Sequence, residues 1–154
     1  YSMQITALRF FTVYGPYGRP DMALFQFAEA AVKGKTIDVY NYGNMNRDFT
    51  YVDDIVNGIA ILMNSLLNTE EPQAEIYNIG RGQQVQLMDF ISEIEKNMGR
   101  EIKKNLVPRH PADTLETWSD TTKLKELGWK PKVSIPEGVS KFCEWYKKYY
   151  GVNQ

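Results

Sequence analysis

The chain has 154 residues, of which 43% are hydrophobic and 24% charged, and its formal net charge at pH 7 is −1. This composition is typical of a soluble globular protein with one sizeable core. The near-neutral charge gives no reason to expect nucleic acid or a membrane surface as a partner, and the apolar runs are too short to span a bilayer. Cys143, the lone cysteine, cannot form an internal disulfide. We therefore expect a cytoplasmic protein.

An apolar segment opens the chain. Residues 6–13 are apolar on both faces apart from Arg9 and run into a turn rich in glycine and proline. This pattern predicts a buried central strand of a parallel sheet. Because no initiator methionine, cap or polar arm precedes the strand, we expect the chain to be the rear part of a larger enzyme.

A loop and a helix follow this strand. The loop, residues 14–22, contains Arg19, and a helix is predicted over residues 22–33, with Asp21 as its N-cap and Gly34 as its stop. Backbone N–H groups at a helix N-terminus attract anions, most of all beyond the carboxyl end of a parallel strand. We therefore expect an anionic substrate at this loop.

The middle of the chain alternates short strands with an amphipathic helix. Extended segments are predicted over residues 36–42 and 47–52, and Asp53 and Asp54 then open a helix as its cap and first-turn charge. The apolar residues expected on the inner face of this helix are Ile55, Ile59, Leu62, Met63 and Leu66. A strand over residues 75–80 follows, and the intervening chain is long enough for it to pair in parallel with the first strand.

The last third of the chain is mainly helical. Helices are predicted over residues 87–98 and 121–127, with an extended segment over residues 102–107 between them. Ser134 and Glu137 form a capping-box pattern that opens a final helix. The inner side of this final helix is expected to carry Val139, Phe142, Tyr146 and Tyr149, with Cys143 as core filler. The whole pattern predicts a mixed α/β fold in which the part after about residue 83 caps the sheet.

Four short motifs follow one another at consistent spacing. They are Leu-Arg-Phe-Phe-x-x-Tyr-Gly-Pro at 8–16, Asn-Arg-Asp-Phe-Thr-Tyr-Val-Asp-Asp at 46–54, Tyr-Asn-Ile-Gly at 77–80 and Leu-Gly-Trp-x-Pro at 127–131. Together they resemble the extended short-chain dehydrogenase/reductase family of nucleotide-sugar epimerases and dehydratases. Residues 11–25, with Ile-Asp-Val-Tyr-Asn at 37–41, are similar specifically to the UDP-glucuronate 4-epimerases of capsular polysaccharide synthesis.

The resemblance implies a fold in two parts. Residues 1–82 would supply the last strands and helices of a Rossmann-like parallel sheet, with interleaved substrate-binding segments. Residues 83–154 would form a small C-terminal mixed α/β subdomain that binds the UDP-sugar. The family's glycine fingerprint for NAD, its catalytic Ser/Thr and its Tyr-x-x-x-Lys pair have no match in this sequence. We therefore expect a missing N-terminal Rossmann half to carry them, and this chain alone to be inactive.

The resemblance also implies the reaction. NAD would take a hydride from C4 of UDP-glucuronate and return it to the opposite face of a keto-sugar intermediate. Two alternatives stay open: another family enzyme, such as a dTDP-glucose 4,6-dehydratase or a UDP-sugar decarboxylase, and a non-catalytic nucleotide-sugar-binding module. The oligomeric state is also open, a homodimer of the longer protein included.

Two arginines are the strongest candidates for substrate contacts. By the resemblance, Arg47 holds the diphosphate, for which a guanidinium offers two parallel charge-assisted donors. The alternative is a surface ion pair with Asp48 or a neighbouring carboxylate, which would contribute little. Arg19 is expected to face the substrate's phosphate or the glucuronate carboxylate, and its alternative is a solvated loop position.

The resemblance assigns further residues to the nucleotide sugar. Thr12 would contact the sugar, and Asp113 would accept hydrogen bonds from ribose hydroxyl groups. The other expected substrate contacts are Met22, Ala23, Tyr40, Asn78, Arg109 and His110. His110 stands where relatives often carry Arg or Gln, so a fixed positive charge is lost there, with Arg109 as the substitute.

Phe10 and Val13 are expected to line the cofactor pocket of the longer enzyme. His110 is the only histidine in the chain, so a multi-histidine metal site is excluded. Trp145, Tyr146, Tyr149 and Tyr150 are interpreted as packing with an amphipathic edge.

Overall fold

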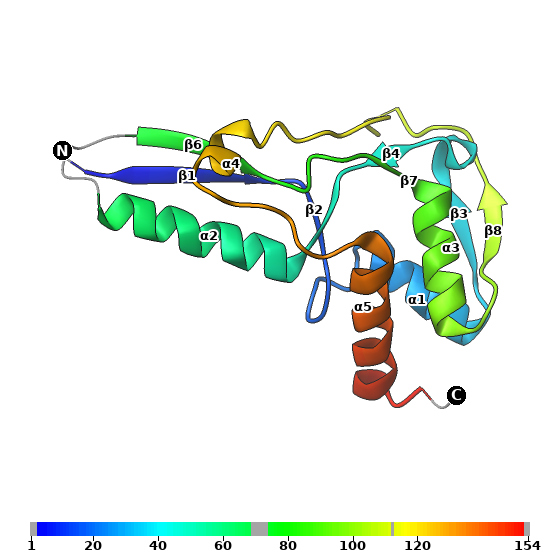
Figure 1. Cartoon of the computed structure of the whole chain (residues 1–154). Helices are drawn as coiled ribbons and strands as arrows, with labels where there is room; N and C mark the ends of the chain where they lie inside the picture. Colours follow the sequence, from blue (N-terminus) through cyan, green and yellow to red (C-terminus); the bar gives the residue numbers. More distant parts are fainter. Residues whose placement is uncertain (1–2, 69–73, 112, 153–154) are drawn as a thin grey trace.

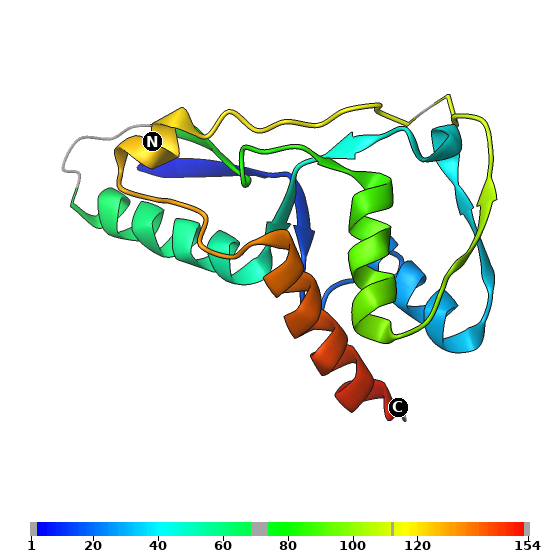
Figure 2. The same cartoon turned by 45° about the vertical axis from the view of Figure 1, so that its right-hand side comes forward.

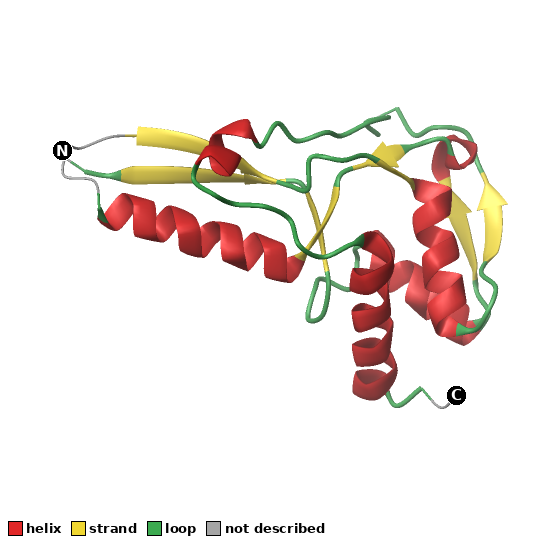
Figure 3. Ribbon diagram, in the orientation of Figure 1, coloured by secondary structure: helices red, strands yellow, loops and turns green. Residues whose placement is uncertain are grey.

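The computed structural model describes residues 3–68, 74–111 and 113–152 of the chain. It confirms the predicted α/β class. In these residues the strands form four separate pairs (Figure 3). One parallel strand pair, a long helix (residues 52–67) and a short helix (residues 122–126) lie at one end of the molecule, and the other three described α-helices gather at the other end (Figure 1). No helix in the described part has both the length and the apolar content that a membrane span requires.

The first strand pairs as predicted but is divided. Strand β1 (Ile5–Phe10) runs parallel to β6 (Ala74–Ile79), and β2 (Thr12–Tyr14) runs parallel to β5 (Phe49–Tyr51). The predicted single strand 6–13 is therefore interrupted at Phe11. The N–H of Phe11 donates to the carbonyl of Ile79 in β6 at 3.4 Å, whereas the N–H of the next residue donates to the carbonyl of Asp48 at 3.1 Å. The chain thus exchanges one pairing partner for another.

The predicted burial of this first strand on both faces is wrong for the described chain. Ile5 is 47% exposed and Phe10 is 49% exposed. Within the described residues β1 pairs on one edge only, with β6. Two-sided burial would require more layers than these residues provide.

Helix α2 (Val52–Leu67) packs along the β1–β6 pair (Figures 1 and 2). Its residues Ile55 and Leu62 are buried, but Met63, which we predicted to face inward, is 58% exposed. The predicted cap is also wrong, because the N-cap is Tyr51 and makes no side-chain capping bond. Asp54 is instead buried, and its carboxylate accepts the N–H groups of the loop at residues 132–133 at 2.9 and 3.0 Å.

Helix α1 (Ala23–Lys33) begins one residue later than predicted. Its N-cap is Met22 without a side-chain capping bond, and the Asp21 prediction is wrong because that carboxylate pairs with Arg19. The helix ends at Gly34, with a φ of 64°, as predicted. The left-handed conformation at this residue is one that glycine adopts without steric penalty.

Beyond α1, strand β3 (Thr36–Val39) runs parallel to β8 (Lys103–Leu106), and β4 (Asn46–Arg47) runs antiparallel to β7 (Val85–Gln86). The predicted strand 36–42 stops early because a 3-10 turn, η1 (Tyr40–Gly43), follows β3 with positive φ at its two central residues. Each of these two pairings links a strand before residue 82 to a strand after it. The division into units 1–82 and 83–154 stays a prediction.

The main core lies between α1, α3 (Leu87–Met98) and α5 (Ile135–Tyr150). Ser134 accepts the N–H of Glu137 at 3.3 Å, which confirms the predicted helix start. Cys143 is buried, as predicted, but Tyr149 is 60% exposed and does not face the core. A short helix, α4 (Thr122–Glu126), covers β6 together with the buried Trp129.

Candidate functional site

Two adjoining cavities lie where β2 meets α1. They share Thr12, Met22, Ala23 and Phe49. The smaller cavity, of about 140 Å³, is walled by the loop between β2 and α1. The larger cavity, of about 320 Å³, extends past β3. The volume of the larger cavity lies at the lower end of the range of small-molecule sites.

The larger cavity gathers residues from distant parts of the sequence. Six residues that the sequence analysis singled out line it: Thr12, Met22, Ala23, Tyr40, Arg47 and Asp113. They come from five positions around the cavity: Thr12 from the first residue of β2, Met22 and Ala23 from the start of α1, and the other three from the 3-10 turn, β4 and the loop after β8. The fold therefore brings a cation, a carboxylate and a helix N-terminus to one cavity.

Arg47 is held in place by backbone carbonyl groups. Its Nη1 donates to the carbonyl oxygens of Asn46 and Leu115, each at 3.0 Å. Partial burial lowers the pKa of the Arg47 guanidinium, and the negative charge of Asp113 opposes that shift. An arginine nevertheless stays charged at neutral pH. The bonds at Nη1 fix its plane, and Nη2 and Nε carry further donors.

Asp48 is not the ion-pair partner of Arg47, because its carboxylate is fully buried and bonded elsewhere. The charge of a neighbouring carboxylate, that of Asp113, does act on Arg47. Oδ1 of Asp48 accepts the N–H of Arg81 at 2.9 Å. Its Oδ2 accepts the N–H groups of Gly82 and Ser119, both at 3.0 Å. Sequence reasoning missed this role, since a buried acid bonded to backbone carries no local signature.

The start of α1 gives the cavity a positive pole. The helix has no acidic residue in its first turn and no side-chain cap at Met22. No carboxylate in the first turn of α1 therefore neutralises the positive end of the helix dipole. This arrangement favours an anion beside Met22 and Ala23.

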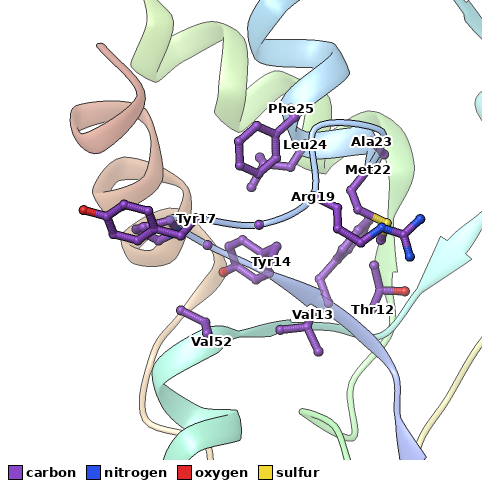
Figure 4. Close-up of a pocket in the computed structure, with 14 residues that line it drawn as sticks. Thr12, Val13, Tyr14, Tyr17, Arg19, Met22, Ala23, Leu24, Phe25 and Val52 are labelled. Atoms are coloured by element: carbon purple, nitrogen blue, oxygen red, sulfur yellow. The ribbon is translucent and has the colours of Figure 1, made fainter. Parts of the chain in front are cut away.

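Arg19 lines the smaller cavity from the loop. Its Nε donates to Oδ1 of Asp21 at 3.0 Å, and its Nη2 bonds to the other carboxylate oxygen. This contact lowers the pKa of Asp21 and raises that of Arg19. Both side chains are exposed. In Figure 4 the Arg19 side chain extends on the same side of the loop as Met22 and Thr12.

The other predicted residues are distributed around the cavities. Asn78 does not line either of them, and its Nδ2 donates to the carbonyl of Asp120 at 2.9 Å. Arg109 and His110 are exposed, and the His110 ring lies edge-on to Tyr40, with the centroids 6.3 Å apart.

The two predicted cofactor residues are separated. Val13 lines the smaller cavity, whereas Phe10, at the carboxyl end of β1, lines neither cavity. Sequence reasoning also missed Gln26 and Asp38, which line the larger cavity. Asp38 accepts a hydrogen bond from Nδ2 of Asn105 at 2.7 Å, a link across the β3–β8 pair that depends on strand register.

The α/β fold, with an anion-attracting cavity beside the carboxyl ends of parallel strands, is that of a nucleotide-binding enzyme class. Residues 1–80 match the model of the NAD dependent epimerase/dehydratase family. The chain belongs to this family.

Several known proteins are similar to the chain. Protein CapI of Staphylococcus aureus is 45% identical over 164 residues, which cover 97% of this chain and 49% of that protein. A probable UDP-glucuronate 4-epimerase of Rhizobium meliloti (strain 1021) is 42% identical over 165 residues, covering 97% of this chain and 48% of that protein. The chain thus spans about half the length of these relatives.

A solved structure agrees with the fold. The UDP-glucuronic acid 4-epimerase from Bacillus cereus, in complex with UDP-glucuronic acid and NAD, is 34% identical with a TM-score of 0.82. The match covers 93% of this chain and 45% of that one. The predicted Rossmann-like architecture is confirmed.

Proposed function

We propose that this chain is the UDP-sugar-binding portion of a longer NAD-dependent UDP-glucuronate 4-epimerase that serves capsular polysaccharide synthesis. One observation carries the proposal: Arg47, Asp113 and the start of α1 converge on a single cavity of suitable size. The similarity to UDP-glucuronate 4-epimerases supports the choice of substrate.

The diphosphate would lie between Arg47 and the N-terminus of α1. Both groups favour negative charge, and the guanidinium adds directional charge-assisted bonds. Asp113 would accept hydrogen bonds from the ribose hydroxyl groups, and Tyr40 would border the base. The contacts of Arg47 with two backbone carbonyl groups support this assignment, because they hold its charge at the cavity before substrate arrives.

The sugar would extend toward the smaller cavity. Thr12 is shared by both cavities and offers a hydroxyl, and Arg19 offers a cation for the glucuronate carboxylate. This arrangement separates two anions of the substrate, the diphosphate and the carboxylate, between two arginines. A neutral UDP-hexose would use only one of these arginines.

The binding site for the cofactor would be completed by parts of the longer protein outside this chain. When bound, NAD supplies the acceptance and return of the hydride. Phe10 fits a place beside it, because its ring is 49% exposed at the carboxyl end of a parallel strand, where the fold class binds nucleotides. Val13, which lines the smaller cavity, would border the cofactor from the side of the sugar.

A direct experiment is to incubate the longer enzyme with UDP-glucuronate and to analyse the product by mass and by sugar composition. We expect the 4-epimer, UDP-galacturonate, at unchanged mass. Loss of water would indicate a dehydratase, and loss of carbon dioxide a decarboxylase. The present chain alone should bind UDP-sugar without turnover; steady turnover by the purified chain would refute that part.

A further inference from the structure

The loop between β2 and α1 is fastened to the C-terminal helix through one aromatic side chain. The Tyr17 ring lies 5.0 Å from the Trp145 ring and 6.1 Å from the Tyr149 ring, measured between centroids. Trp145 and Tyr149 stack on each other one turn apart on α5, at 5.0 Å and 26°. The Tyr17 ring therefore contacts two rings that already stack on each other.

The backbone at Tyr17 has an uncommon conformation. Its φ is 58°, in the left-handed region that bulky residues rarely adopt. Its side chain is among the most exposed of the large hydrophobic residues, at 79%. Burial in the core thus does not account for the conformation. The side-chain contacts that the structure describes for Tyr17 are those with the Trp145 and Tyr149 rings on α5.

The same loop carries Arg19, two residues further on. Figure 4 shows the Tyr17 and Arg19 side chains leaving the loop in opposite directions, Tyr17 toward α5 and Arg19 toward Thr12. Residues 15–19 form one wall of the smaller cavity. Fastening the loop to α5 on its outer side therefore fixes the position of Arg19 on its inner side.

We infer that Tyr17, Trp145 and Tyr149 form an aromatic clasp that positions the loop 15–21 so that Arg19 meets the acidic group of the sugar. The inference rests on the proposed function for the identity of the substrate. Tyr149 is a positioning residue in this scheme, because it lines neither cavity. Tyr17 lines the smaller cavity, but its ring turns toward α5 (Figure 4), so its role in this scheme is also positioning. The clasp would favour acidic over neutral sugars, since it acts through an arginine.

The test compares three variants of the longer enzyme. Tyr17→Gly removes the ring and also relieves the left-handed backbone, so the protein should fold as well as the wild type. Tyr17→Phe keeps the ring and should behave as the wild type. Tyr150→Ala is the control on α5: its ring lies 6.3 Å from Trp145 and 5.1 Å from Tyr149 but has no described contact with Tyr17.

For Tyr17→Gly we expect KM for UDP-glucuronate to rise roughly two- to tenfold, the range that corresponds to one aromatic pair contact. The inhibition constant of UDP should be unchanged, because UDP binds at Arg47 and does not reach the loop. An equal rise in both constants would indicate a general structural effect and would overturn the inference.

Hydrogen exchange of the loop amides separates this inference from the proposed function. Exchange over residues 15–21 should accelerate in Tyr17→Gly but not in Tyr17→Phe or Tyr150→Ala. Unchanged exchange in Tyr17→Gly overturns the clasp whatever the substrate is. A wild-type enzyme that does not epimerise UDP-glucuronate would instead refute the proposed function and leave the exchange result to decide the clasp.

Discussion

Removal of the buried Asp48 carboxylate should destabilise the chain more than any surface substitution. This carboxylate accepts the N–H groups of Arg81, Gly82 and Ser119 as well as the hydroxyl of Ser119, at 2.5 to 3.0 Å. These bonds hold the β6–β7 loop and the segment 115–119 against β5. The same segment presents the Leu115 carbonyl to Arg47.

The size of the effect follows from the acceptors that would remain. In Asp48→Ala, the N–H of Arg81 keeps the Thr50 hydroxyl as an acceptor at 2.8 Å, and the N–H of Gly82 keeps the Ser119 hydroxyl at 3.1 Å. The Ser119 N–H loses the acceptor it has at Asp48. One orphaned amide and the loss of charge-assisted bonds together cost about 3–5 kcal/mol. This is a large fraction of the stability of a small domain, about 5–15 kcal/mol.

Urea denaturation of the purified chain, followed by circular dichroism, measures this effect. For a slope of about 2 kcal/mol/M, the midpoint should fall by roughly 1.5–2.5 M. Asp53→Ala, at an exposed acid in the first turn of α2, is the control and should shift the free energy of unfolding by no more than about 0.5 kcal/mol. If the two variants unfold at the same midpoint, the carboxylate does not hold these loops.

Three further predictions concern Arg47, the proposed diphosphate contact, and two buried groups. Arg47→Ala in the longer enzyme should raise KM for UDP-glucuronate about 10–100-fold through loss of charge-assisted bonds, with partial retention in Arg47→Lys. Tyr14→Phe should leave the urea midpoint unchanged or raise it, because the buried Tyr14 hydroxyl has no hydrogen-bond partner in the described structure. Burial raises the pKa of the Cys143 thiol from 9.0 to about 12. The folded chain therefore keeps a proton that the unfolded chain loses, and its contribution to stability should fall as pH rises from about 9 toward 12.

Each of these predictions has a clear contrary result. Equal KM values for Arg47→Ala and the wild type would place the diphosphate elsewhere. A lower urea midpoint for Tyr14→Phe would reveal a partner for the hydroxyl. For Cys143, the relevant quantity is the difference in stability between the wild type and Cys143→Ala across this pH range, and a constant difference would contradict burial of the thiol.

Local sequence signals predicted many of the element ends correctly. Gly34 and Gly99 end α1 and α3 because each adopts a left-handed conformation that other residues disfavour. Ser134 begins α5 because its side chain accepts an N–H of the first turn. These interactions join residues within a few positions of each other, so the sequence alone contains them.

The failures have other causes. Asp21 does not cap α1 because Arg19, two residues away, competes for its carboxylate. Strand 6–13 is divided because β5 and β6 pair with different parts of it. Met63 and Tyr149 satisfy helical periodicity but lie beyond the edge of the packed face. In the strand and the two helices, a partner distant in sequence or a boundary of the core decides between options that are locally equivalent.

The sequence by itself determined the family, the α/β class and six of the residues that line the larger cavity, because a motif preserves residue type and spacing. Only the tertiary structure decided which of these residues meet. It brings Arg47 to Asp113 and to the start of α1, and leaves Asn78 bonded elsewhere. It also reveals Asp48 as the buried anchor of two loops. Hydrogen bonds between residues far apart in sequence depend on the closed fold, and no local pattern encodes them.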